Sequence, residues 1–260
     1  MLDLSQIESY YPEPLRAFKR NLLREYLHYK LLEIIYDSTA GSRLTFIGGT
    51  AIHIIHGAPR FSEDLDFDDR GLSDDDFRRL ETQVRAEIKL QGFSVETAVV
   101  ARNARRIIVR LPGLFQLYGL SSDPREKLRL HIDTEPQRFR YKPAAVLIDK
   151  FDVFGRIFVA PVDVLLAQKV TCLFTRPRPM GRDVYDALFL WGKTEPSLAY
   201  LGDRLGVRSG RELRSRLTER CRELDFDRLA GDVAPFLFRP EDAKKVKLFP
   251  DFIKAHEFEE

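Results

Sequence analysis

The stretch FIGGTAIHIIHGAPRFSEDLDFD, residues 46–68, decides the fold class of this 260-residue chain. Its apolar start favours a β-strand, which ends at Gly48 and Gly49, where a turn leads into a short helix. Residues 64–68 then alternate acidic and apolar side chains, which is typical of a half-buried strand. The stretch therefore predicts a strand, a glycine turn, a short helix and a second, acidic strand.

The acidic strand offers a site for divalent cations. Asp64 and Asp66 are two residues apart, so both carboxylates point to one face of the strand. Carboxylates held side by side repel each other unless a cation lies between them, and such oxygen ligands suit Mg²⁺ or Mn²⁺. If the predicted strand 127–134 lies beside the acidic strand, Asp133 faces the same site. Three carboxylates on adjacent strands are what a two-metal phosphoryl-transfer site requires.

The glycine turn offers a site for phosphate. Gly48, Gly49 and Thr50 have a backbone that a phosphate can approach, and the helix that follows supplies free N–H donors. Taken alone, the turn also fits an ordinary strand-to-helix connection, and the acidic pair also fits a solvated strand end. The whole order is more specific, because it continues through Arg60, Phe61, Ser62 and Glu63 into the acidic strand.

Residues 43–68 resemble the first motif of the AbiEii-type nucleotidyltransferases, toxins of abortive-infection toxin–antitoxin systems within the DNA polymerase β-like superfamily. Residues 161–190, with AQKVTCLFTR and GRDVYDALFL, are similar to the second and third motifs of the family. The resemblance implies an α+β fold. Over residues 1–160, we expect a polymerase β-like core with a small mixed sheet and an N-terminal helix. Over residues 161–260, we expect a helical lobe that completes the active site.

The resemblance also assigns roles to residues. The metal-binding pair of the family maps onto Asp64 and Asp66, its essential lysine onto Lys169, and its later acid onto Asp183 or Asp186. Asp183 is favoured because it directly follows an arginine. Without the resemblance, a lysine on an amphipathic helix is a surface charge and an adjacent Arg–Asp pair is a weak exposed ion pair. The residues expected to bind the nucleotide are Gly48, Gly49, Thr50, Arg60, Ser62, Arg176 and Arg182.

The function implied is that of a Mg²⁺- or Mn²⁺-dependent nucleotidyltransferase toxin. It transfers a nucleoside monophosphate from a nucleoside triphosphate to an acceptor and releases pyrophosphate, with a tRNA 3′ end favoured as acceptor and a cognate antitoxin as partner. Two alternatives remain open: the same chemistry on a small molecule such as an antibiotic, or a module that binds nucleotide without turnover.

Composition limits the partners of the chain. Lys plus Arg number 42 and Asp plus Glu number 40, which excludes a uniformly basic nucleic-acid coat. Basic residues gather locally in 102–142 and 204–222, where they form either solvated faces or a phosphate-contacting surface for RNA. The nearby aromatic residues fit base stacking or ordinary core packing: Tyr118, Phe139 and Tyr141.

Cysteine and apolar residues indicate the compartment. Cys172 and Cys221 are too few for a disulfide scaffold, and the histidines show no zinc spacing with them, which leaves His53, His56 and His131 as supporting groups. No apolar run approaches the roughly 20 residues of a membrane span, and the first residues lack a signal-peptide pattern. We therefore expect a cytoplasmic protein without a membrane partner.

Periodicity predicts the remaining elements. The helices expected before residue 160 lie over 14–38, 50–57 and 74–91, the last with Ser73 as N-cap and Gly92 at its end. The strands expected are 43–47, 64–68, 93–101, 105–111, 127–134, 144–149 and 156–160. The later helices expected are 162–175, 182–192, 197–205, 209–224 and 226–238, and the charged tail after Pro240 is unassigned.

Overall fold

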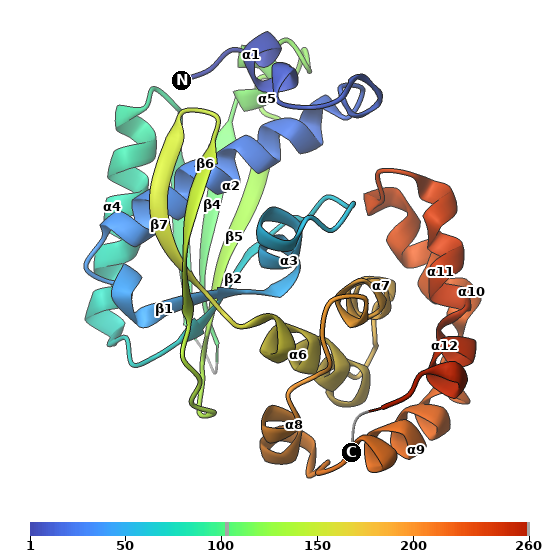
Figure 1. The fold of residues 1–260 in the computed structure, drawn as a ribbon. Helices are drawn as coiled ribbons and strands as arrows, with labels where there is room; N and C mark the ends of the chain where they lie inside the picture. The colour runs from blue at the N-terminus through green and yellow to red at the C-terminus, as the bar shows by residue number, and fades with distance from the viewer. Residues whose placement is uncertain (102–103, 259–260) are drawn as a thin grey trace. The chain divides into compact units, whose positions relative to one another are not determined.

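The structure is a computed structural model that describes residues 1–101 and 104–258 (Figure 1). It is a mixed α/β fold built on a seven-stranded sheet in the order β3-β4-β5-β2-β1-β7-β6. The strands are β1 (Leu44–Ile47), β2 (Leu65–Asp69), β3 (Glu96–Ala101), β4 (Arg105–Pro112), β5 (Lys127–Pro136), β6 (Ala144–Lys150) and β7 (Val153–Val159). The pairs β2–β5 and β1–β7 are parallel, and the other four are antiparallel. The sheet is therefore mixed, as the α+β interpretation expects.

All eight helices predicted from the hydrophobic periodicity are present, and the structure has additional short helices near the N-terminus, after β4 and in the tail. They are α1 (Leu4–Ser9), α2 (Lys19–Asp37), α3 (Gly48–His56), α4 (Asp74–Leu90), α5 (Leu114–Leu117), α6 (Val162–Thr175), α7 (Gly181–Trp191), α8 (Leu198–Leu205), α9 (Gly210–Cys221), α10 (Phe226–Val233), α11 (Lys244–Lys247) and α12 (Phe249–Ala255). None of the helices in the described ranges combines the length and the apolar character needed to cross a bilayer.

The sheet has one apolar and one polar face. Along β5, Leu130 and Ile132 are fully buried, whereas His131 and Asp133 alternate with them on the opposite face. Alternate side chains of a strand share one face. The apolar residues of the neighbouring strands are likewise buried: Leu65 and Phe67 of β2, and Ile107 and Val109 of β4. Burial of each large apolar side chain contributes about 1.5–3 kcal/mol, so the apolar face fixes the orientation of the polar one.

Helices α2 and α4 pack against this sheet (Figure 1). α2 contacts β7 and α4, and α4 contacts β3. The predicted helix over 14–38 starts only at Lys19, because Pro14 lies in a preceding 3₁₀ turn. Ser73 caps α4 as predicted, by accepting a hydrogen bond from the Asp76 N–H, and Gly92 follows its end with a φ of 89°.

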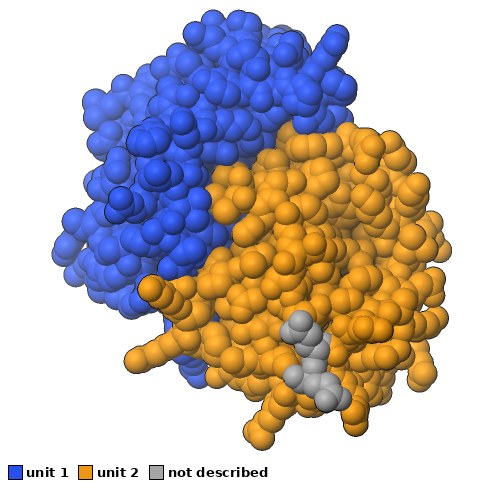
Figure 2. All heavy atoms as spheres, viewed as in Figure 1, with its two compact units in different colours: residues 1–51, 62–138, 143–159 blue, residues 52–61, 139–142, 160–260 orange. Residues whose placement is uncertain are grey.

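The chain divides into two compact units (Figure 2). The sheet unit comprises residues 1–51, 62–138 and 143–159, and the helical unit comprises 52–61, 139–142 and 160–260. The expected boundary near 160 did not anticipate that 52–61 belongs to the helical unit. Backbone bonds explain this placement: the Phe61 N–H donates to the Phe236 carbonyl at 2.7 Å, and the Phe238 N–H donates to the Pro59 carbonyl at 3.1 Å.

The helical unit is held by close helix packing. α7 packs against α6 and α10. Gly181 permits the contact with α10, because a Cβ at this position would lie 1.8 Å from the Leu229 carbonyl oxygen. The unassigned tail folds as α11 and α12, with Phe249 and Ile253 buried.

Candidate active site

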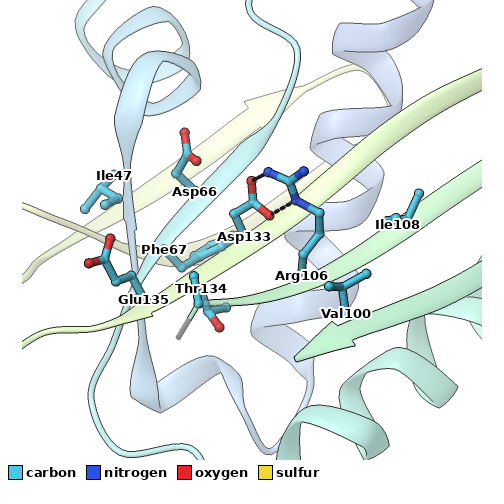
Figure 3. Close-up of a pocket in the computed structure, with 10 residues that line it drawn as sticks. Ile47, Asp66, Phe67, Val100, Arg106, Ile108, Asp133, Thr134 and Glu135 are labelled. Carbon is cyan, nitrogen blue, oxygen red and sulfur yellow. Dashed lines mark hydrogen bonds and ion pairs between the residues drawn. The ribbon is translucent and has the colours of Figure 1, made fainter. Parts of the chain in front are cut away.

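The acidic residues of the sheet unit gather on its polar face. Asp66 and Asp133 are register partners in the parallel pair β2–β5, which confirms the strand pairing expected from the sequence. They line a hollow of about 840 Å³ (Figure 3), whose other lining residues include Ile47, Val100, Ile108 and Glu135. Asp64 lies immediately before β2.

Asp133 is held by an arginine that the sequence did not identify. Arg106 is its register partner on β4, and the guanidinium donates to both carboxylate oxygens, from Nε at 2.6 Å and from Nη2 at 2.8 Å (Figure 3). The hydrogen bond to Asp133 raises the pKa of Arg106 above its ordinary value. Arg106 therefore occupies the oxygens that Asp133 would offer to a metal.

Asp64 lies in a crowded acidic environment. Burial raises the pKa of Asp64 above its ordinary value of 3.8, and the charges of Asp133 and Glu63 also raise it. His131 acts in the opposite direction, with its Nδ1 2.9 Å from the carboxylate. Ionised carboxylates that lie close together repel each other, and a cation bound between them offsets this repulsion.

The glycine turn positions the acids. Gly48 has a φ of 76°, and a Cβ there would lie 2.2 Å from Oδ2 of Asp66. Thr50 is fully buried, and its hydroxyl donates to the Asp64 carbonyl. The Thr50 side chain therefore positions the acidic segment, and the binding of phosphate by the backbone of the turn stays a prediction. Gly49 is buried and Ser62 is partly exposed.

We expect Gly48→Ala to lower kcat by about 100-fold, because the new Cβ must displace the Asp66 carboxylate and small displacements of reacting groups are costly. Gly57→Ala is a matched control, since Gly57 has a φ of 77° and a Cβ added there would meet no atom within 4 Å. Steady-state kinetics of both variants tests this. Equal losses of activity in the two variants would assign the effect to backbone strain instead.

A second cluster, in the helical unit, joins three cations to two carboxylates. Arg60 is fully buried and donates to both oxygens of Asp186, from Nε at 2.6 Å and from Nη2 at 2.7 Å. Lys169 Nζ lies 2.9 Å from Asp186 and 3.3 Å from Asp183. Arg176 joins the network from its exposed edge, since its Nη1 lies 2.9 Å from Asp183.

The network favours the charged forms of Lys169 and Asp186. Burial alone would lower the pKa of Lys169, but Asp186 and Asp183 raise it above its ordinary value. Burial would raise the pKa of Asp186, but Arg60 and Lys169 lower it. Both Asp183 and Asp186 therefore belong to one ion-pair network with Lys169, and neither is the exposed acid that the isolated sequence pattern indicates.

Two of the arginines expected to bind nucleotide have contacts of their own in this unit. Arg60 is 1% exposed, and its Nη1 donates to the Phe61 carbonyl at 2.9 Å. Its guanidinium therefore holds Asp186, a positioning role that replaces the predicted nucleotide contact. Arg182 lies over the Phe236 ring, 4.5 Å from its centroid.

The sheet unit provides some of the oxygen ligands that a divalent cation needs. Within residues 1–101 and 104–258, no three His, Cys, Asp or Glu side chains are grouped closely enough to hold a metal ion by themselves. Asp64 and Asp66 are hard oxygen donors, and Asp66 is seated against Gly48, where only glycine fits. Asp133 would join them only after leaving Arg106.

The two basic stretches differ in their surroundings. In 102–142, Arg105 pairs with Asp69 and Arg106 with Asp133, while Arg102 lies outside the described residues. In the helical unit, the exposed face of α9 carries a hollow lined by Arg211, Arg214, Ser215, Thr218, Glu219 and Arg222.

The aromatic residues near the first basic stretch have packing partners. The Tyr118 hydroxyl donates to the Leu2 carbonyl at 2.9 Å. Phe139 stacks on Tyr141 and meets Tyr200 edge-on. These contacts favour the core-packing alternative over base stacking.

The fold is found in solved structures from Helicobacter pylori. JHP933 aligns with a TM-score of 0.53 and 18% identity over 90% of this chain and 91% of that chain. A second structure, described as that of a candidate nucleotidyltransferase, has the same TM-score and identity over 90% of this chain and 94% of that chain. No curated protein matches the chain.

The chain shares the fold of these structures, and its sheet carries acidic residues on the polar face. The profile of the family described as nucleotidyl transferase AbiEii toxin, type IV toxin–antitoxin system, matches residues 30–252. The chain belongs to this family, and its membership confirms the resemblance of residues 43–68 and 161–190.

Proposed function

We propose that this nucleotidyltransferase transfers a nucleoside monophosphate from a nucleoside triphosphate to an RNA acceptor, with the tRNA 3′ end favoured, and that it uses Mg²⁺ or Mn²⁺. The observation that carries the proposal is the register pairing of Asp66 with Asp133 beside Asp64 on the polar face of the sheet. A cognate antitoxin is the expected partner of such a toxin, as the family description implies.

In the proposed reaction, an acceptor hydroxyl attacks the α-phosphorus of the triphosphate, the bond to the β-phosphate oxygen breaks, and pyrophosphate leaves. Asp64 and Asp66 would hold the cation, and Gly48 keeps the Asp66 carboxylate in place. When bound, the cation polarises the phosphate oxygens and lowers the pKa of the attacking hydroxyl. Asp133 becomes a further ligand only if Arg106 releases it.

The family likeness assigns the essential lysine to Lys169, and the ammonium of this residue would neutralise the charge that grows on the triphosphate as pyrophosphate leaves. Its ammonium stays protonated because Asp183 and Asp186 raise its pKa. Arg176 is the most exposed residue of the network around it, with 43% of its side chain accessible. An accessible guanidinium close to a buried ammonium favours an anionic substrate.

The exposed arginines of α9 support an RNA acceptor. Arg211, Arg214 and Arg222 line one hollow with a single carboxylate, that of Glu219. Backbone phosphates of structured RNA are contacted mainly by such side chains, without dependence on sequence.

A transfer assay tests the proposal. We expect α-labelled nucleoside triphosphate to label tRNA in the presence of Mg²⁺, with release of pyrophosphate, and not to label aminoglycoside-like alcohols. Expression of the protein should arrest growth, and sequencing of tRNA 3′ ends should show added nucleotides that are absent with Asp64→Asn. Label only on the small molecule would identify an antibiotic-type transferase, and no turnover with any acceptor would contradict the proposed reaction.

A further inference from the structure

Arg24 on α2 lies close to the acidic segment that precedes β2. Four residues further along the same helix, His28 Nε2 lies 3.0 Å from the Glu63 carbonyl oxygen. Side chains four residues apart share one face of a helix, so Arg24 and His28 face this segment together. The charges of Glu63 and Asp64 act on the Arg24 guanidinium, which agrees with its place on the helix face that carries His28.

Arg24 has no partner that explains its position. Its Nε is buried and has no hydrogen-bond partner within the described chain, and none of the ion pairs of the described residues includes it. Other cations of α2 are paired: Arg20 with Glu126, and Lys30 with Glu33. A partly buried donor without a hydrogen-bond partner destabilises a fold, so a structural role does not account for the position of Arg24.

A guanidinium recognises a particular class of ligand. Its planar donors match paired oxygens, as in carboxylate or phosphate, and the neighbouring carboxylates of Glu63 and Asp64 form no ion pair with Arg24. A phosphate bound beside a cation on Asp64 would bring paired oxygens to this place. The family profile begins at residue 30 and therefore does not include Arg24.

We propose that Arg24 is a substrate-binding residue that donates to the phosphate oxygens of the nucleotide beside Asp64. The proposal rests on the proposed nucleotidyltransferase function. It predicts that Arg24 contributes to nucleotide affinity and not to the stability of the fold.

The test compares Arg24→Met and Arg24→Lys with the wild-type chain by calorimetric titration. The probes are the four nucleoside triphosphates and inorganic tripolyphosphate, each with Mg²⁺. We expect Arg24→Met to weaken the Kd of the best nucleotide and of tripolyphosphate alike, by about 10-fold to 100-fold, and Arg24→Lys to weaken both by less. In turnover, KM should rise with kcat nearly unchanged, and the Tm of Arg24→Met should stay equal or rise.

Arg20→Gln is the matched control, because Arg20 lies one turn earlier on α2, exposed and paired with Glu126. It should bind nucleotide as the wild type does. Wild-type affinity in Arg24→Met would overturn the role of Arg24 and leave the proposed function intact. Weakened nucleotide binding with unchanged tripolyphosphate binding would overturn the phosphate contact, and a lowered Tm with equal loss of kcat would indicate a structural role. Absence of nucleotide binding by the wild type would overturn both proposals.

Discussion

Asp66→Asn is expected to lower kcat by about 1,000-fold and to abolish toxicity, because a neutral amide cannot replace a carboxylate that holds a divalent cation. The substitution keeps the shape of the side chain that is seated against Gly48. Asp64→Asn is expected to act in the same way. Burial and neighbouring acids raise the pKa of Asp64, so its ionised form lowers the free energy of unfolding at neutral pH. This destabilisation disappears as the pH falls and the carboxylate is protonated.

The free energy of unfolding should therefore change little, by less than about 1 kcal/mol, in both variants. Asp75→Asn is the matched control, since Asp75 lies on the exposed face of α4 with 73% of its side chain accessible. Transfer assays and urea unfolding of the three variants check the prediction. Wild-type turnover in either Asp66→Asn or Asp64→Asn would exclude these carboxylates as the metal-binding pair.

Asp186→Asn is expected to destabilise the helical unit by about 3–5 kcal/mol, because it leaves the buried guanidinium of Arg60 without its carboxylate. The pH dependence has a definite sign. The lowered pKa of Asp186 contributes stability above about pH 3.8, the ordinary value, and this contribution is lost as the pH falls through the lowered pKa. The variant should lack that acid-sensitive component of its stability.

Urea unfolding at several pH values measures both effects. Asp251→Asn is the control, since Asp251 is 71% exposed and forms an exposed ion pair with Lys254 three residues along its helix. The double variant Arg60→Met, Asp186→Leu should recover part of the loss, because the buried guanidinium and its carboxylate are then removed together. A loss for Asp186→Asn no larger than that of Asp251→Asn would show that the network does not stabilise the fold.

The elements of the fold were largely predictable because they carry local periodicity. The alternation in 127–134 predicts both β5 and the face on which Asp133 lies, and the register with Asp66 confirms it. The departures have local causes. The helix expected over 226–238 ends at Val233, where Pro235 favours a 3₁₀ turn, and the tail after Pro240 is unassigned from the sequence because it is highly charged.

The contacts that shape the site were not predictable, because they join residues far apart in the chain. Arg60 and Asp186 are 126 residues apart, and Arg106 and Asp133 are 27 apart. No spacing rule marks such pairs, so an arginine next to a glycine-rich motif is interpreted as a ligand for phosphate. Only the burial of Arg60 shows that its positive charge serves another side chain.

The pairing of β2 with β5 also limits how this protein can change in length. Because strand side chains alternate between faces, inserting or deleting one residue within β2 would turn Asp66 inward and Phe67 outward. Such an insertion or deletion would disrupt the apolar core and the acidic site together, so it could not abolish catalysis and leave the fold intact. Length variation is compatible with the fold only in connections such as residues 70–73 and 137–143, which lie outside the strands and helices that place the carboxylates.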